Sequence, residues 1–199
     1  MKVTVGISNR HVHVTKEHLE ILFGKDYELQ VLRPVNQPGQ FASVEKVSIE
    51  TPKSKIEGVR ILGPIRPYTQ VEISKTDAIK LGLHPPVRDS GDLKGSEPIT
   101  IIGPCGKVDI EEGCILATRH IHMTPEQRRE FGLEGITKVG VKIGGEKGGI
   151  LKDVHIKSAD ASYYEMHIDT DDANAFLLNN NDEVEILVGT EYESWISYL

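Results

Sequence analysis

The amino-acid sequence predicts a mainly β protein built from two small β-barrels that are capped by short α-helices and related by internal duplication. Three observations support this prediction. Short segments rich in valine, isoleucine and threonine recur along the 199-residue chain, turn-forming residues separate them, and one histidine-containing motif occurs twice. Only short helical patterns lie between the segments, which disfavours an alternating βαβ architecture.

Eight segments are expected to be strands because apolar and β-branched residues dominate them and Gly, Pro, Asn or Asp bound them. They are residues 2–7, 44–49, 59–62, 70–73, 99–102, 139–143, 154–156 and 184–188. The 19 glycines and 10 prolines of the chain fit many tight turns. The glycine-rich segment 144–149 lacks the Walker spacing that ends in Lys-Ser/Thr, so it is predicted to be a hairpin loop.

Four short helices are expected between the strands. Thr15 and Thr124 have the side chain of an N-cap, and Pro125 suits the first helical position after the second cap. Residues 75–81 and 170–178 are predicted to be the other two helices.

Composition restricts the classes of partner. A hydrophobic content of 38% is that of an ordinary globular chain, and no apolar run reaches the roughly 20 residues that span a bilayer. The net charge of −7 disfavours nucleic-acid binding. The N-terminus has no apolar signal region, so a cytoplasmic protein is expected, with Cys105 and Cys114 as reduced, buried thiols.

An internal repeat connects the histidines to one another. The segment 10–17, Arg-His-Val-His-Val-Thr-Lys-Glu, matches the segment 119–126, Arg-His-Ile-His-Met-Thr-Pro-Glu. A weaker match relates residues 72–78 to residues 167–173. Each half therefore supplies a His-x-His pair and, later, one further candidate ligand.

These residues predict two metal sites. Histidines at positions i and i+2 of a strand point to the same face, so their rings can bind one ion. Catalytic zinc takes three protein ligands and keeps one position open. Imidazole-rich sets favour zinc among divalent ions. The predicted sets are His11, His13 and Glu72, and His120, His122 and His167. A single His-x-His would be read as structural, and His18, His84 and His155 are expected to be ordinary surface or capping histidines.

Four segments together resemble the phosphate propanoyltransferases, a family of phosphotransacylases. They are residues 8–13, 62–74, 86–91 and 118–123, and the resemblance runs from about residue 3 to residue 188. It implies reversible conversion of a short-chain acyl-CoA and inorganic phosphate to acyl phosphate and CoA. It also implies two Zn²⁺ ions bound by the six residues named above, with CoA as co-substrate.

The resemblance further implies a domain organisation in which the first strand returns to the second barrel. The domains would be residues 1–9 with 118–190, and residues 10–117. Arg66 matches the phosphate-binding arginine of the family, and Ser8 matches a position near the metals. Arg88 lies in an Arg-Asp-Ser-Gly turn, which is either a structural loop or a contact to a phosphate of CoA or of the substrate.

Similar proteins often carry an N-terminal helical extension that directs them to bacterial microcompartments. Here the first predicted strand begins almost at Met1, which favours a free cytoplasmic enzyme. The aromatic C-terminal tail, residues 191–199, is expected to pack either on a partner subunit, as in a homodimer, or on its own barrel. Two other functions stay open: a binuclear metallohydrolase, which normally uses bridging carboxylates between metals about 3.5–4 Å apart, and a non-catalytic metal-binding module.

Overall fold

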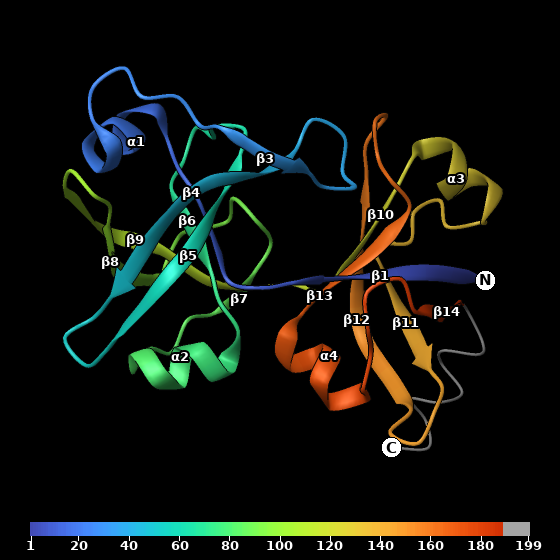
Figure 1. Cartoon of the computed structure of the whole chain (residues 1–199). Helices are drawn as coiled ribbons and strands as arrows, with labels where there is room; N and C mark the ends of the chain where they lie inside the picture. Colours follow the sequence, from blue (N-terminus) through green and yellow to red (C-terminus); the bar gives the residue numbers. More distant parts are fainter. Residues whose placement is uncertain (189–199) are drawn as a thin grey trace. The chain divides into compact units, whose positions relative to one another are not determined.

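The computed structural model describes residues 1–188, and the chain divides into two compact units. One unit comprises Asn9–Ala117, and the other comprises Met1–Ser8 and the chain from Thr118 onward. Figure 1 shows the helices and strands of both units. The predicted tail, residues 191–199, lies outside the described residues. The division into the domains 1–9 with 118–190 and 10–117 stays a prediction.

The unit Asn9–Ala117 contains a closed ring of six strands. In order around the ring these are β4 (Phe41–Glu50), β5 (Lys55–Gly63), β2 (His11–His13), β6 (Gln70–Glu72), β9 (Lys107–Ala117) and β8 (Glu97–Ile102). Strand β8 pairs back with β4 and closes the barrel. Two short strands, β3 (Val31–Pro34) and β7 (Val87–Arg88), pair with β4 and β9, and two helices, α1 (Lys16–Phe23) and α2 (Lys75–Leu81), complete the unit.

The second unit is also a closed six-stranded barrel. Its order is β1 (Lys2–Ser8), β13 (Glu165–Asp169), β10 (His120–Met123), β12 (Gly149–Ser158), β11 (Lys138–Ile143) and β14 (Glu183–Leu187), with helices α3 (Pro125–Glu130) and α4 (Thr170–Phe176). The expected fold class, two small barrels with short helices, is therefore confirmed. No helix within residues 1–188 is long and apolar enough to cross a membrane.

The pairing pattern is the same in the two barrels and shows the duplication directly. Strands β2 and β10 each pair in parallel with one neighbour, β5 or β12, and antiparallel with the other, β6 or β13. Strands β9 and β1 then add in parallel to β6 and β13. Since β1 precedes β2 and β9 precedes β10 in the chain, the first strand of each repeat completes the barrel of the other repeat. In Figure 1, β1 (blue) runs beside the orange strand β13.

Each barrel is filled by alternate residues of its strands. Val12 and Val71 are fully buried in one core, and Ile121 and Met166 are fully buried in the other. Because side chains alternate across a strand, the neighbours of these four residues face out of the barrel. The candidate metal ligands are among those neighbours.

All eight segments predicted as strands and all four predicted helices are present, and both His-x-His pairs lie on strands as expected, but four other strands were missed. Two of the missed strands, β9 and β13, have the sequences KVDIEEGCILA and EMHID. Their polar residues break the apolar runs by which the other strands were recognised. Residues 144–148 lie between the antiparallel strands β11 and β12, as expected for a hairpin loop, and Gly149 begins β12.

The two cysteines differ in their surroundings. Both are free, but only Cys114 is buried, so the expectation of a buried thiol is wrong for Cys105, which is exposed. Burial and the charge of Glu97 raise the pKa of the Cys114 thiol to about 12. Cys114 therefore stays protonated and packs as an apolar side chain.

Candidate metal centres

Every strand that carries candidate ligands ends in a helix cap. Two residues after the last ligand of each of these strands, a polar side chain accepts a hydrogen bond from a backbone N–H in the first turn of the next helix. These caps are Thr15, Ser74, Thr124 and Asp169. Because N-caps stabilise helix ends by about 1 kcal/mol, each ligand is held between a sheet and a fixed helix start.

The strand register places the third candidate ligand directly opposite the first. His11 pairs with Glu72 across β2 and β6, and His120 pairs with His167 across β10 and β13. Cross-strand partners have Cβ atoms about 5 Å apart. The weak sequence match between residues 72–78 and 167–173 thus corresponds to the same place in the two barrels.

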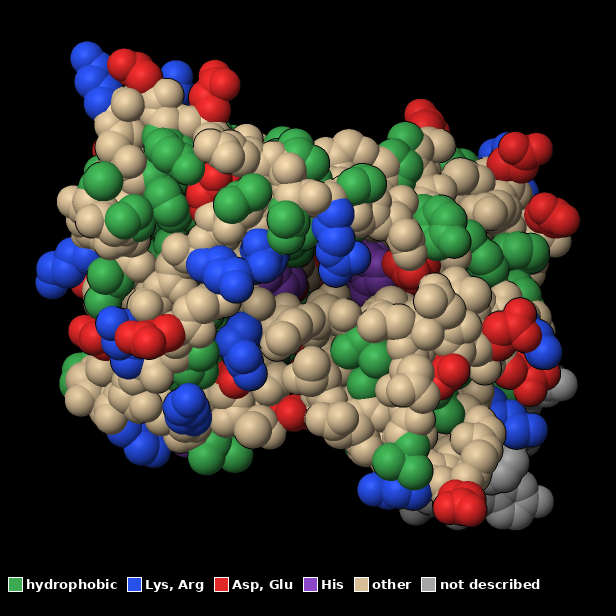
Figure 2. Space-filling model, viewed as in Figure 1, with side chains coloured by type: hydrophobic (Ala, Val, Ile, Leu, Met, Phe, Trp, Pro, Cys, Tyr) green, Lys and Arg blue, Asp and Glu red, His purple; other side chains and the backbone are tan. Residues whose placement is uncertain are grey.

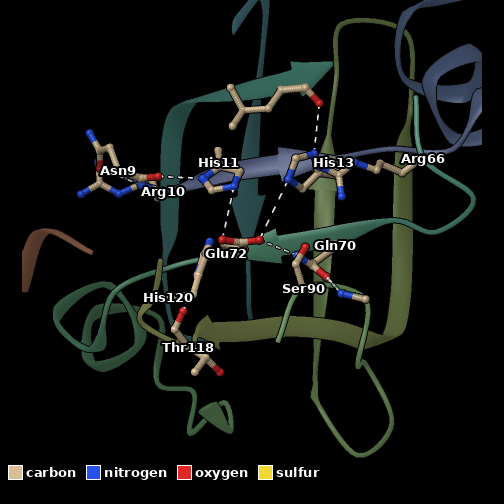
Figure 3. Close-up of polar contacts among 12 residues, drawn as sticks. Asn9, Arg10, His11, His13, Arg66, Gln70, Glu72, Ser90, Thr118 and His120 are labelled. Atoms are coloured by element: carbon tan, nitrogen blue, oxygen red, sulfur yellow. Dashed lines mark hydrogen bonds and ion pairs between the residues drawn. The ribbon is translucent and has the colours of Figure 1, made fainter. Parts of the chain in front are cut away.

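The first group, called the Glu72 cluster, consists of His11, His13 and Glu72. Its ligand atoms all lie within 4.8 Å of one another. Figure 3 shows both imidazole rings directed at the Glu72 carboxylate, with 3.4 Å from His11 Nε2 to Oε2 and 4.0 Å from His13 Nε2 to Oε1. The Nδ1–H groups of His11 and His13 donate to the carbonyl oxygens of Asn9 (2.8 Å) and Leu62 (3.2 Å). Both Nε2 lone pairs are thereby directed toward the ligand space.

The second group, called the His167 cluster, consists of His120, His122 and His167, again with ligand atoms within 4.8 Å of one another. His120 Nδ1 donates to the carbonyl oxygen of Thr118 (2.7 Å), so its Nε2 carries the lone pair. That atom lies 3.1 Å from His122 Nε2. A bound cation suits two imidazole nitrogens that converge in this way, and three imidazoles form a ligand set typical of Zn²⁺.

Burial keeps His120 and His122 of the His167 cluster in the neutral form that binds metal. Burial, followed by the charges of Lys157 and His167, lowers the pKa of His120 to about 3. Burial, His167 and Lys157 lower the pKa of His122 to about 4. Neutral imidazole is the metal-binding form, so at neutral pH no proton competes for these two nitrogens.

The Glu72 cluster differs because it contains a carboxylate. Burial and the charges of His11 and Arg66 lower the pKa of His13 to about 3. Burial also acts to lower the pKa of His11, but the charge and hydrogen bond of Glu72 outweigh it and the pKa of His11 is raised. Without an ion, one imidazole of this cluster is therefore paired with the carboxylate.

We expect the metal-free protein to lose stability as the pH falls from about 6.5 toward 4. In the unfolded chain these histidines take up a proton near pH 6.5, whereas in the folded protein His13, His120 and His122 do so only near pH 3 to 4. Between these values the unfolded state holds more protons, so acid favours unfolding, and above pH 6.5 the contribution is complete. Urea midpoints at pH 7 and pH 5, with a chelator present, measure the difference. The exposed His84, changed to glutamine, is the control and should leave the pH dependence as in the parent protein.

An arginine–aspartate ion pair connects each His-x-His segment to a helix. Arg10 Nε lies 2.8 Å from Asp77 Oδ2, and Arg119 Nε lies 2.8 Å from Asp172 Oδ2. Each arginine immediately precedes the first ligand histidine, and each aspartate lies in the first turn of the helix that follows the third ligand. The repeat thus preserves this ion pair in both barrels.

We expect Arg10→Met to destabilise the protein more than Arg119→Met. The side chain of Asp77 is only 5% exposed, whereas that of Asp172 is 20% exposed. Removing one partner of a buried pair leaves an uncompensated charge, which costs on the order of 3 kcal/mol, and solvent reduces the cost at the more exposed site. Urea denaturation of both variants measures the two costs. Equal losses of stability would contradict the role assigned to burial.

The other predicted site residues lie in three places. Arg66 follows β5, and its backbone N–H donates to Val14 while its Nη1 donates to the Tyr68 hydroxyl (3.0 Å). Its charge acts on His11 and His13, so it lies close to the Glu72 cluster. Ser8 ends β1 opposite Asp169, two residues beyond the partner of His167. Arg88 lies on β7 with its Nε 3.6 Å from Asp92.

Two buried side chains beside the third ligands were not predicted from the sequence. Gln70 is fully buried and Glu165 is 4% exposed. Each stands two residues before the third ligand of its cluster, on the same face of the strand. Strand alternation applied to the weak repeat would have found both. His18, His84 and His155 belong to neither cluster, and His18 bonds to Thr69 through Nδ1 (2.7 Å).

The ligand residues of the two clusters differ in accessibility. Those of the His167 cluster are half-buried, whereas His11 and His13 are buried. Histidine side chains (purple) are visible from solvent in Figure 2, and side chains of both charge signs occur across the same face. Some histidine rings among residues 1–188 are therefore accessible to a small ligand.

Comparisons with known proteins point to one family. Residues 4–179 match the family model described as phosphate propanoyltransferase. Relatives named phosphate propanoyltransferase include one from Thermotoga maritima, 51% identical over 187 residues that cover 93% of this chain and 89% of that protein. One from Rhodopseudomonas palustris is 47% identical over 93% of this chain and 82% of its own length. One from Rhodobacter capsulatus is 46% identical over 92% of this chain and 86% of its own length.

Proposed function

The chain belongs to the phosphate propanoyltransferase family, and from this premise we propose that it is a two-metal enzyme that moves a short acyl group between CoA and phosphate. The reaction converts acyl-CoA and inorganic phosphate to acyl phosphate and CoA, and it runs in both directions. The observation that carries the proposal is the pair of clusters, each with three ligand atoms within 4.8 Å of one another. Their donor sets, three imidazoles in one and two imidazoles with a carboxylate in the other, suit Zn²⁺.

The acyl transfer is proposed to be a direct displacement. A phosphate oxygen attacks the thioester carbonyl, the C–S bond breaks, and CoA leaves as a thiolate without a covalent enzyme intermediate. The chain lacks the Gly-x-Ser-x-Gly nucleophile motif, which argues against an acyl-serine. A free thiol has a pKa near 8.5 and phosphate is strongly hydrated, so both reacting groups need positive charge. Zn²⁺ held by the Glu72 cluster would supply that charge to the CoA sulfur, and Zn²⁺ held by the His167 cluster would supply it to phosphate.

The protein residues orient the substrates. Arg66 presents a planar guanidinium that can donate two hydrogen bonds to phosphate and neutralise part of its charge. Ser8 faces the same side of β1 as Gly6, the strand partner of His167, and its hydroxyl is assigned to a substrate oxygen. Arg88 is assigned to a phosphate group of CoA. Holding both reactants in line can lower the barrier by several kcal/mol.

A direct assay tests the proposal. Protein loaded with Zn²⁺ should release free CoA from acetyl-CoA or propanoyl-CoA only when phosphate is present, and a chelator should abolish the release. Comparing the two acyl groups measures chain preference, for which one methylene is worth about 1–3 kcal/mol. Phosphate-independent release of the acyl group as free acid would favour the hydrolase alternative. Metal-loaded protein without any CoA-dependent exchange would refute the enzyme. The cytoplasmic location and the homodimer stay predictions, and microcompartment association stays an untested alternative.

A further inference from the structure

Gln70 and Glu165 occupy equivalent positions in the two barrels. Gln70 stands two residues before Glu72 on β6, and Glu165 stands two residues before His167 on β13. In register, they pair with His13 and His122. A buried polar side chain costs about 1–3 kcal/mol unless it is hydrogen-bonded, so the partners of these two residues indicate why they are there.

Each of the two residues bonds to the third ligand of its own cluster, with opposite polarity. The Gln70 amide donates to Glu72 Oε1 (2.6 Å), and the Nε2–H of His167 donates to Glu165 Oε2 (2.7 Å). An amide donor thus meets a carboxylate ligand, and a carboxylate acceptor meets an imidazole ligand. The residue types differ at equivalent positions of the repeat: Gln-x-Glu in one barrel corresponds to Glu-x-His in the other.

The hydrogen bond to Glu165 decides which atom of His167 can bind an ion. With Nε2 carrying the hydrogen that faces the carboxylate, Nδ1 is the nitrogen that retains a lone pair. The other two histidines of the His167 cluster differ, because Nδ1 of His120 is bonded to a carbonyl oxygen and its Nε2 faces His122 Nε2.

The backbone beside this pair is shaped to admit it. Gly6 on β1 is the register partner of His167. A Cβ at Gly6 would lie 2.8 Å from the Glu165 carboxyl carbon and 3.1 Å from His167 Cδ2, closer than ordinary contact. The equivalent partner of Glu72 is Ile115, not a glycine. The small residue therefore accompanies the Glu165–His167 pair specifically.

We propose that Glu165 is a positioning residue that holds His167 with Nδ1 toward the ion of the His167 cluster. This inference rests on the proposed function, since it takes that cluster as an ion site. A carboxylate that accepts from a metal-bound imidazole fixes the ring and increases its basicity, and losing such a partner typically weakens metal binding 10–100-fold. Gln70 has the matching role for Glu72, whose Oε2 it leaves available by engaging Oε1.

The experiment compares Zn²⁺ affinity, by competition with a chromophoric chelator, in the parent protein and in Glu165→Met and Gln70→Met. The parent should bind two ions. Glu165→Met should bind one of them 10–100-fold more weakly and leave the other unchanged, and Gln70→Met should weaken only the other ion. The unaffected ion is the internal control for folding. Glu165→Gln should recover most of the affinity because its amide oxygen still accepts the hydrogen bond.

Three results separate the outcomes. Parent protein that binds fewer than two ions contradicts the proposed function. Two ions in the parent with unchanged affinity in Glu165→Met contradicts this inference alone. A changed visible spectrum of the Co²⁺-saturated variant, indicating a lost ligand, would make Glu165 itself a ligand and also overturn it. If Glu165→Met does not fold, Gly6→Ala carries the same test: its methyl group should displace the pair and weaken the same ion, and unchanged affinity contradicts the inference.

Discussion

Replacing His120 with alanine is expected to reduce bound zinc from two ions to one and to lower activity about 10³-fold. The remaining cluster would hold only His122 and His167, fewer than the three protein ligands of a catalytic zinc site. Loss of that ion removes charge stabilisation of several kcal/mol, which corresponds to the stated factor. Elemental analysis and the phosphate-dependent release of CoA measure the two effects on the same sample.

His155→Ala is the matched control for this variant. His155 is the β12 partner of His120 in the strand register, but it belongs to neither cluster. The His155→Ala protein should therefore bind both ions. A His120→Ala protein that retains two ions, or that loses one ion while keeping full activity, would contradict the catalytic role of the His167 cluster.

Replacing Arg66 with alanine is expected to raise the KM for phosphate about 10–100-fold while both zinc ions and the KM for acyl-CoA stay near the parent values. The estimate follows from a charged hydrogen bond worth about 1.5–3 kcal/mol. Arg66 is held by its backbone bond to Val14 and by Tyr68, so the guanidinium is oriented before phosphate arrives.

Two further variants test the geometry of the Arg66 guanidinium rather than its charge. Arg66→Lys keeps the charge without the planar fork and should recover only part of the phosphate affinity. Tyr68→Phe removes the hydroxyl that accepts from Arg66 and should have a smaller effect in the same direction. Loss of zinc in Arg66→Ala, or an unchanged KM for phosphate, would refute the assignment.

Much of the fold could be predicted because the strands that bury one face have clear apolar patterns. The repeat is more informative than any single strand, since it relates residues 72 and 167 without knowledge of the strand pairing. The structure places those residues opposite His11 and His120. The six residues proposed as ligands thus form two compact groups.

The other features of the fold and of the candidate site could not be predicted, because they depend on contacts between segments that are distant in the sequence. Strand β9 reads as polar, since its charged residues face outward, and its identity as a barrel strand is apparent only from its pairing with β6 and β8. The carbonyl oxygens of Asn9, Leu62 and Thr118 select the histidine tautomers. Every residue has a backbone carbonyl group, so a sequence motif does not indicate which of them accepts a hydrogen bond from a histidine. The role of Glu165 likewise depends on the close approach of Gly6.

The exchanged first strand has a consequence for synthesis of the protein in the cell. Strand β1 leaves the ribosome before every other described strand, but its partners β13 and β14 are the last two described strands to be made. The buried side chains Val3 and Val5 therefore have no barrel to enter until nearly the whole chain has emerged. Such long-range pairing slows folding and prolongs exposure of apolar surface. A nascent chain of this enzyme is thus expected to depend on holding chaperones more than a protein whose barrels close in sequence order.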